Sequence, residues 1–126
     1  MKEIRYPIFT GKVVHGLEVG RTLGYPTANI ETTSNNIPQD GVYIVQITID
    51  NSLQYGIMSI GNRPTFDAKN KTIEVHLLDF SDDLYLQTLT IKPLLYIREN
   101  KKFENINLLK QQLQKDKDFA YRYLSI

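Results

Sequence analysis

The sequence has 126 residues, which suffice for one domain with a hydrophobic core of its own. Its 15 basic and 14 acidic side chains leave a net charge of +1, so no strong field would attract nucleic acid or an anionic membrane. The absence of cysteine excludes disulfides, thiolate metal sites and cysteine nucleophiles. No apolar run is as long as a membrane-spanning helix, and the first residues lack the apolar core of a signal peptide. We therefore expect one cytoplasmic domain over residues 1–126, a monomer without a nucleic-acid or membrane partner.

Most of the chain alternates apolar and polar residues with the two-residue period of β-strands. Tyr43, Val45 and Ile47 fall on one face of such a segment, and an Asp-Asn-Ser turn at 50–52 connects it to the next. Pro93 lies inside the last apolar run, where it indicates an edge strand or a bulge. The strands are expected at Phe9–Val14, from Tyr43 to Ile49, Gln54–Ile60, Ile73–Phe80 and Thr88–Arg98.

The C-terminal segment changes to the period of an α-helix. Asn105 is a suitable N-cap, because its side-chain oxygen can accept a hydrogen bond from a free backbone N–H of the first turn. Short strands followed by one terminal helix predict a mainly β fold, a closed antiparallel barrel with the helix outside it or over one end. The expected apolar stripe of the helix comprises Ile106, Leu109, Leu113, Ala120 and Leu124.

The segment from Gly20 to Asn29 has the composition of a loop that receives a ligand. Its two glycines permit positive φ and a close approach to the backbone, while Pro26 favours an extended chain around it. In an extended chain Thr27 and Asn29 point to the same side, where a hydroxyl and an amide oxygen suit Mg²⁺ or phosphate better than a soft metal. A solvent-exposed turn is the alternative. The spacing matches neither a P-loop nor a dinucleotide fingerprint.

Glu74 is the carboxylate with the most unusual position. It lies in mid-strand on the face opposite Ile73 and Val75, and the simplest interpretation is a solvated residue on an outer face. His76 shares that face, where a lone histidine is more often a hydrogen-bonded structural residue than a catalyst. The charged segment from Arg98 to Phe103 precedes the helix, and only Phe103 is unexplained by solubility.

Two segments near the N-terminus resemble the riboflavin kinase (flavokinase) family: Gly11–Gly16 (Gly-Lys-Val-Val-His-Gly) and Gly20–Asn29 (Gly-Arg-Thr-Leu-Gly-Tyr-Pro-Thr-Ala-Asn). The Pro-Thr-Ala-Asn element in this setting is highly specific. The resemblance extends to Asp116 in the expected helix, which is nearly the whole chain. The later segments that agree in order are Gly41–Tyr43, Ile60–Phe66, Glu74–Phe80, Asp83–Tyr85, Ile97–Arg98 and Phe103.

The resemblance implies a six-stranded antiparallel Greek-key barrel that transfers the γ-phosphoryl group of ATP to the ribityl 5′-hydroxyl of riboflavin, giving FMN. It implies that Thr27 and Asn29 hold Mg²⁺ and the phosphates, and that Glu74 is the base for the ribityl hydroxyl. Phosphoryl transfer requires mainly positioning and charge neutralisation, with one acceptor for the proton of the alcohol, so these roles are chemically coherent. The residues implied over the two substrates are Gly20, Arg21, Leu23 and Gly24 for the nucleotide and Arg98 and Phe103 for the flavin.

The chain departs from the family pattern at two places. Leu86 follows Tyr85 where the family usually has glycine, which suggests a turn of different shape. Glu99 and Asn100 follow the arginine where the family often has Pro-Glu, so contacts on the flavin side are expected to differ.

A non-catalytic barrel that binds flavin or nucleotide is the alternative function. Such a binder has little need for Thr27, Asn29 and Glu74 together, whereas a kinase needs all three. In many bacteria the kinase module is joined to a second module that converts FMN to FAD. Nothing in the sequence resembles that nucleotidyltransferase, so a stand-alone kinase and an excised domain both remain open.

Overall fold

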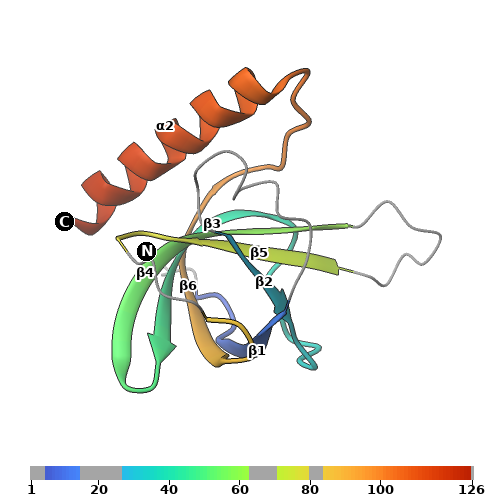
Figure 1. Ribbon diagram of the computed structural model, residues 1–126, viewed down its shortest axis with the longest axis vertical. Helices are drawn as coiled ribbons and strands as arrows, with labels where there is room; N and C mark the ends of the chain where they lie inside the picture. The colour runs from blue at the N-terminus through green and yellow to red at the C-terminus, as the bar shows by residue number, and fades with distance from the viewer. Residues whose placement is uncertain (1–4, 15–26, 63–70, 80–83, 126) are drawn as a thin grey trace.

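The computed structural model describes residues 5–14, 27–62, 71–79 and 84–125, which form an antiparallel β-barrel followed by a long helix (Figure 1). The strands close in the order β1-β2-β5-β4-β3-β6, because β1 pairs with β6 as well as with β2. The described elements are β1 (Phe9–Val14), β2 (Thr27–Glu31), β3 (Gly41–Ile49), β4 (Ser52–Asn62), β5 (Lys71–Leu77), β6 (Thr88–Arg98) and α2 (Ile106–Leu124).

The strand order is that of a Greek key, as expected. β3, β4 and β5 are sequential neighbours, whereas β2 lies beside β5 although a long connection joins it to β3. Closure gives each described strand two paired neighbours. For the site, the important consequence is that β2 and β5, which are far apart in sequence, are hydrogen-bonded neighbours.

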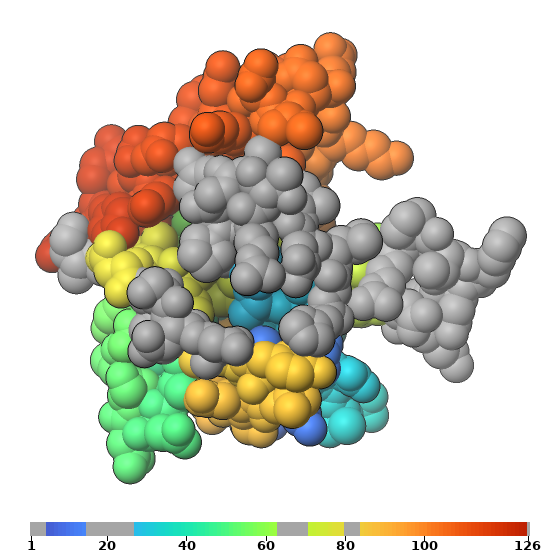
Figure 2. Space-filling view, in the orientation of Figure 1, coloured from blue at the N-terminus to red at the C-terminus, as the bar shows by residue number. Residues whose placement is uncertain are grey.

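The barrel interior contains the apolar face that the alternation predicts. Tyr43, Val45 and Ile47 of β3 are completely buried there. The opposite face of β3 is buried in its first half, where Val42 and Ile44 form a second apolar cluster together with Ala120 of α2. The helix therefore packs on the outside of the barrel, and Figure 2 shows it covering one side of the molecule.

The helix begins where the cap predicts. The Asn105 side chain accepts a hydrogen bond from the Leu108 backbone N–H at 3.0 Å, which confirms the predicted N-cap. The predicted stripe is wrong at its first position, because Ile106 is 59% exposed. The buried residues of α2, Asp116 and Ala120, lie in its second half, and its first turns lie farther from the strands in Figure 1.

Strand boundaries differ from the expectation by a few residues. The β3–β4 turn consists of Asp50 and Asn51 alone, with φ of 45° and 70°, so β4 begins at Ser52 and is longer than predicted. The irregularity at Pro93 is a bulge, since the β3–β6 register shifts between the pairs Ile44–Leu95 and Val45–Pro93.

Candidate active site

Thr27 and Asn29 lie on the outer face of β2. The chain is extended from Thr27 onward, as predicted. Ala28 and Ile30, which alternate with Thr27 and Asn29, belong to the barrel core. The two polar side chains therefore share the opposite face, because successive strand residues alternate sides. Asn29 is nevertheless only 8% exposed, which makes it one of two buried polar or charged residues in the described part of the chain.

The register of β2 on β5 brings the separate sequence candidates together. Thr27 is directly opposite His76, and Asn29 is directly opposite Glu74. Directly opposed residues of an antiparallel pair have Cβ atoms about 4.5–5.5 Å apart on the same face. Four polar side chains thus form one patch across two strands, and we call Thr27, Asn29, Glu74 and His76 the β2–β5 patch.

A hydrogen bond connects two members of the patch. Thr27 Oγ1 and His76 Nδ1 lie 3.1 Å apart, and the direction of the bond depends on the histidine tautomer. When Nδ1 is unprotonated, the Thr27 hydroxyl donates to the ring and its oxygen remains an acceptor. This arrangement suits a hydroxyl that is to present its oxygen to a cation.

The β6–α2 loop (residues 99–105) reaches the neighbouring strand on the other side of Glu74. Asn100 Nδ2 donates to the Ile60 carbonyl of β4 at 2.7 Å. Ser59, the residue before Ile60, is directly opposite Glu74 in the β4–β5 register. The loop contact, the carboxylate and Asn29 therefore lie on three successive strands, which are spaced about 5 Å apart.

A polar cavity of about 500 Å³ begins at Asn29 and continues past the start of β5. Its walls come from β2, the segment that follows β2, and the first residues of β5. The lining residues are Val14, Asn29, Ile30, Glu31, Thr32, Thr33, Ser34, Asn35, Ile37, Lys71, Thr72 and Ile73. Asn29 is the member of the β2–β5 patch that lines this cavity.

The donors in the patch suit a hard cation with few protein ligands. Among the described residues, no three histidine, aspartate or glutamate side chains are grouped in a way that could hold a metal ion alone. Thr27 and Asn29 offer neutral oxygens, and Glu74 is the carboxylate opposite Asn29. Mg²⁺ is typically bound by one or two protein groups together with substrate phosphates, so this donor set fits Mg²⁺ that arrives with a nucleotide.

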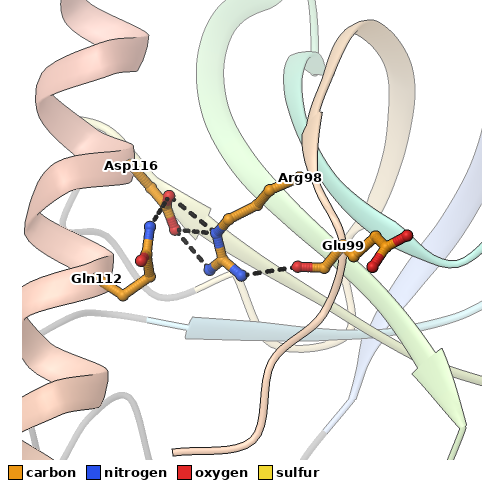
Figure 3. Close-up of polar contacts among 4 residues, drawn as sticks. All are labelled: Arg98, Glu99, Gln112 and Asp116. Carbon is orange, nitrogen blue, oxygen red and sulfur yellow. Dashed lines mark hydrogen bonds and ion pairs between the residues drawn. The ribbon is translucent and has the colours of Figure 1, made fainter.

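Arg98 is held by the helix (Figure 3). Its Nε donates to Asp116 Oδ1 and Oδ2 at 3.0 and 3.1 Å, and its Nη2 donates to Oδ2 at 2.7 Å. Its Nη1 donates to the Glu99 carbonyl at 3.0 Å, and Gln112 Nε2 donates to Asp116 Oδ1 at 2.9 Å. The sequence predicts Arg98 as a flavin contact, a role that stays a prediction. In the structure its guanidinium is engaged by α2.

Some predicted residues are not placed by the structure. Gly20, Arg21, Leu23 and Gly24, the predicted nucleotide loop, lie outside the described residues. Phe103 is half-buried in the β6–α2 loop, between Asn100 and the helix cap.

Two residues of the site, Ser59 and Asp116, are not among the predicted site residues. Ser59 has no local signal, because its position opposite Glu74 is a matter of register. Asp116 does have a signal, since it stands between Leu113 and Ala120 at helical spacing, where an apolar residue is expected. A charged residue on the packed face of a helix indicates a buried partner.

The fold and the patch together define a class of protein. A closed Greek-key barrel with hard oxygen donors opposite a mid-strand carboxylate is suited to metal-assisted phosphoryl transfer to an alcohol. The chain belongs to the riboflavin kinase family, because the family model described as Flavokinase: Riboflavin kinase matches residues 4–124. The predicted family is confirmed.

Individual relatives agree with this assignment. The bifunctional riboflavin kinase/FMN adenylyltransferase of Bacillus subtilis is 40% identical over 119 residues, covering 91% of this chain and 38% of that protein. The RNA-binding riboflavin kinase RibR of B. subtilis is 37% identical over 110 residues, covering 86% of this chain and 47% of the relative. The crystal structure of riboflavin kinase from Trypanosoma brucei has the same fold, with a TM-score of 0.68 at 23% identity over 98% of this chain and 83% of that one. The chain thus spans less than half the length of these two curated relatives.

Proposed function

We propose that this chain transfers the γ-phosphoryl group of ATP to the ribityl 5′-hydroxyl of riboflavin, releasing FMN and ADP. One observation carries the proposal: Glu74 lies on the strand between the β6–α2 loop contact on β4 and Asn29 on β2. A transferase needs its base within reach of the acceptor hydroxyl, at the place where the acceptor and the phosphates meet. The loop proposed for the flavin and the pair proposed for the phosphates flank Glu74 on opposite sides.

Glu74 is the proposed general base. As the ribityl oxygen forms its bond to the γ-phosphorus, the bond from that phosphorus to the bridging oxygen of ADP breaks, and the hydroxyl proton passes to the Glu74 carboxylate. A carboxylate in mid-strand is well placed for this role, because the sheet on both sides fixes its backbone.

Thr27 and Asn29 would hold a divalent cation, with Mg²⁺ as the proposed ion. When bound, such a cation neutralises charge on the phosphate oxygens. The Thr27 hydroxyl oxygen and the Asn29 amide oxygen would orient the nucleotide against the β2–β5 patch. The His76 ring would keep the Thr27 hydroxyl turned toward it.

The remaining contacts are proposed from the family resemblance. Gly20, Arg21, Leu23 and Gly24 would cover the nucleotide, and the β6–α2 loop with Phe103 would cover the flavin. We also propose that residues 1–126 form one kinase domain and that this domain acts as a monomer. The absence of nucleic-acid binding stays a prediction, and the name of the RibR relative makes it worth testing with RNA.

Within the parts of the chain that the structure describes, no helix combines the length and the apolar composition needed to cross a bilayer.

The direct test is incubation with riboflavin, ATP and Mg²⁺, with FMN measured by chromatography. We expect FMN to form with the cation and not to form in excess chelator, because the β2–β5 patch contains no lysine or arginine that could neutralise the phosphates in place of the metal. Turnover that persists in chelator would contradict the metal role. Riboflavin binding without FMN formation would favour the alternative, a non-catalytic flavin-binding barrel.

The metal pair has a test of its own. Thr27→Ala removes the hydroxyl and should weaken the affinity for the metal–nucleotide complex and lower the rate, with riboflavin binding almost unchanged. Thr90→Ala is the matched control, since Thr90 is an exposed strand threonine on β6. Equal rates for the two variants would place the metal elsewhere.

A further inference from the structure

Asp116 is a charged residue on the packed face of the amphipathic helix α2. It is 5% exposed, and it and Asn29 are the buried polar or charged residues of the described chain. A buried carboxylate without partners is strongly unfavourable, and both Asp116 oxygens are accordingly occupied by the Arg98 guanidinium, with the Gln112 amide on Oδ1 (Figure 3).

The pairing fixes the orientation of Arg98 as well as its charge. Nε and Nη2 approach the two carboxylate oxygens as a planar fork, which allows one orientation of the guanidinium plane. Lysine could supply the charge but not the fork. Gln112 lies one helical turn before Asp116 and holds the carboxylate from the other side, so the acceptor cannot turn away from Arg98.

The held guanidinium acts on the chain that follows it. Arg98 is the last residue of β6, and its Nη1 donates to the carbonyl of Glu99, the first residue of the β6–α2 loop. The next residue, Asn100, is tied to β4 through the Ile60 carbonyl. The loop therefore leaves the barrel in a direction set jointly by α2 and β4. Its far end is set by the Asn105 cap.

We propose that Asp116 is a positioning residue for riboflavin. By holding Arg98 it sets the start of the β6–α2 loop, and so places Phe103 and the loop backbone over the planar flavin ring system beside Glu74. This inference rests on the proposed function. Arg98 then serves the flavin through the loop that it holds.

Helix attachment alone does not require an ion pair. The cluster of Val42, Ile44 and Ala120 already joins α2 to the barrel. A buried ion pair adds little net stability over apolar side chains of the same size, because desolvation offsets the attraction. The ion pair instead fixes the orientation of the Arg98 guanidinium, and that orientation sets the start of the β6–α2 loop.

The test separates the two substrates. Michaelis constants for riboflavin and for ATP are measured for the parent, Asp116→Asn and Arg98→Lys. Each variant keeps most of the side-chain volume and loses the fork. We expect the KM for riboflavin to rise about tenfold or more while the KM for ATP stays within about twofold, because the nucleotide is held on the β2 side of Glu74. The double variant should have a KM for riboflavin no higher than that of the more impaired single variant, because both substitutions remove the same contact.

Tyr121→Phe is the matched control for helix docking. It removes another hydrogen bond between α2 and the barrel side, from Tyr121 Oη to Asp79 Oδ1 at 2.7 Å, and does not touch the β6–α2 loop. We expect it to lower the melting temperature without changing the KM for riboflavin. Folded Asp116→Asn and Arg98→Lys variants that keep the parent KM for riboflavin would overturn the proposal. An equal rise with Tyr121→Phe would also overturn it.

A measurement of riboflavin binding in the absence of turnover tests the role of Asp116 separately from the kinase proposal. Quenching of riboflavin fluorescence in the presence of Mg-ADP gives a dissociation constant for each variant. A parent that binds riboflavin but makes no FMN refutes the kinase proposal, and the dissociation constants of the variants still decide the role of Asp116. A parent that binds no riboflavin refutes both. If Asp116→Asn does not fold, Gln112→Ala replaces it, with a smaller rise expected in the same constant.

Discussion

Glu74 lies in the middle of β5, with Asn29 opposite it on one neighbouring strand and Ser59 opposite it on the other. A solvated glutamate on an outer face would look the same in the sequence. The difference lies in the neighbours, because a base must be held within hydrogen-bond reach of the proton that it takes. Paired strands on both sides hold the backbone of Glu74 in that way.

The substitution Glu74→Gln keeps the shape and an acceptor oxygen but removes the basicity. We expect kcat to fall by about 10²–10⁴, the usual contribution of a positioned base, while the KM for ATP changes little. His76→Gln is the paired control on the same face. It should be much milder, because a glutamine oxygen can still accept from Thr27. A Glu74→Gln enzyme with kcat within a few-fold of the parent would show that alignment and metal suffice.

Leu86 is a residue at which the chain departs from its family and from backbone preference. Its φ is 67°, in the left-handed region that glycine favours, within a turn closed by the Gln87 N–H and the Leu84 carbonyl at 2.9 Å. The side chain is 54% exposed, so it gains little from burial.

We therefore predict that Leu86→Gly stabilises the protein. A left-handed leucine costs about 1–2 kcal/mol, and glycine loses about 0.5–1 kcal/mol through its freer unfolded state, which leaves a gain of about 0.5–1 kcal/mol. Urea unfolding of parent and variant measures the difference. Leu53→Gly is the control, an exposed leucine in β4 without positive φ, and it should be destabilising. A destabilised Leu86→Gly variant would mean that the leucine side chain makes compensating contacts.

At the scale of the element, α2 connects the barrel to the β6–α2 loop. Its packed face carries Ala120 in the apolar cluster and Asp116 in the polar contact with Arg98. One face of α2 thus attaches the helix to the barrel and orients the Arg98 side chain. Its first turn, by contrast, is exposed at Ile106 and depends on the cap for its stability.

We expect Asn105→Ala to fray the first turn of α2 and to destabilise the protein by about 1 kcal/mol, within the range of about 0.5–2 for lost caps. Asn107→Ala is the control, since Asn107 is an exposed residue inside the same helix and alanine has the higher helix propensity. Thermal unfolding of both variants measures the effect. Identical melting temperatures would show that the N-cap contributes nothing to the stability of the folded chain.

For the whole molecule, the barrel core is centred on β3, and Tyr43 is its most polar member. The ring is completely buried and meets Tyr6 and Tyr96 edge-on, each with ring centroids 5.3 Å away, while its hydroxyl donates to the Gln39 carbonyl. Burial, with smaller contributions from its neighbours Tyr6, Tyr96 and Asp40, raises the pKa of Tyr43 to about 12.

The raised pKa predicts the alkaline limit of stability. The unfolded tyrosine ionises near 10 and the folded one near 12, so its contribution is complete below pH 10 and is lost as the pH rises toward 12. The loss is about 1.4 kcal/mol per pH unit in that window. Denaturant unfolding between pH 9 and about 11 should show a steeper fall for the parent than for Tyr43→Phe. Parallel slopes would place the alkaline transition at another group.

Local patterns predict most of the elements, and the misses have local causes. β1 and β6 have the predicted bounds, because the residues of both strands alternate in a way that the sequence shows locally. The helical period predicts Ile106 on the packed face, but a local period cannot show which turns of the helix reach the barrel. The burial of Val42 and Ile44 on the outer face of β3 has no local signal either, since it depends on the packing of α2 across them.

The sequence by itself determined the family, the barrel class and the candidate residues Thr27, Asn29 and Glu74. It could do so because segment composition and strand period are local properties of the chain. Only the tertiary structure decided which of these residues are neighbours. The pairing of β2 with β5 joins strands that are separated by two other strands in sequence, and the contact between Arg98 and Asp116 crosses from β6 to the outside of the barrel. Register and helix docking are set by the closure of the whole barrel, which no local pattern encodes.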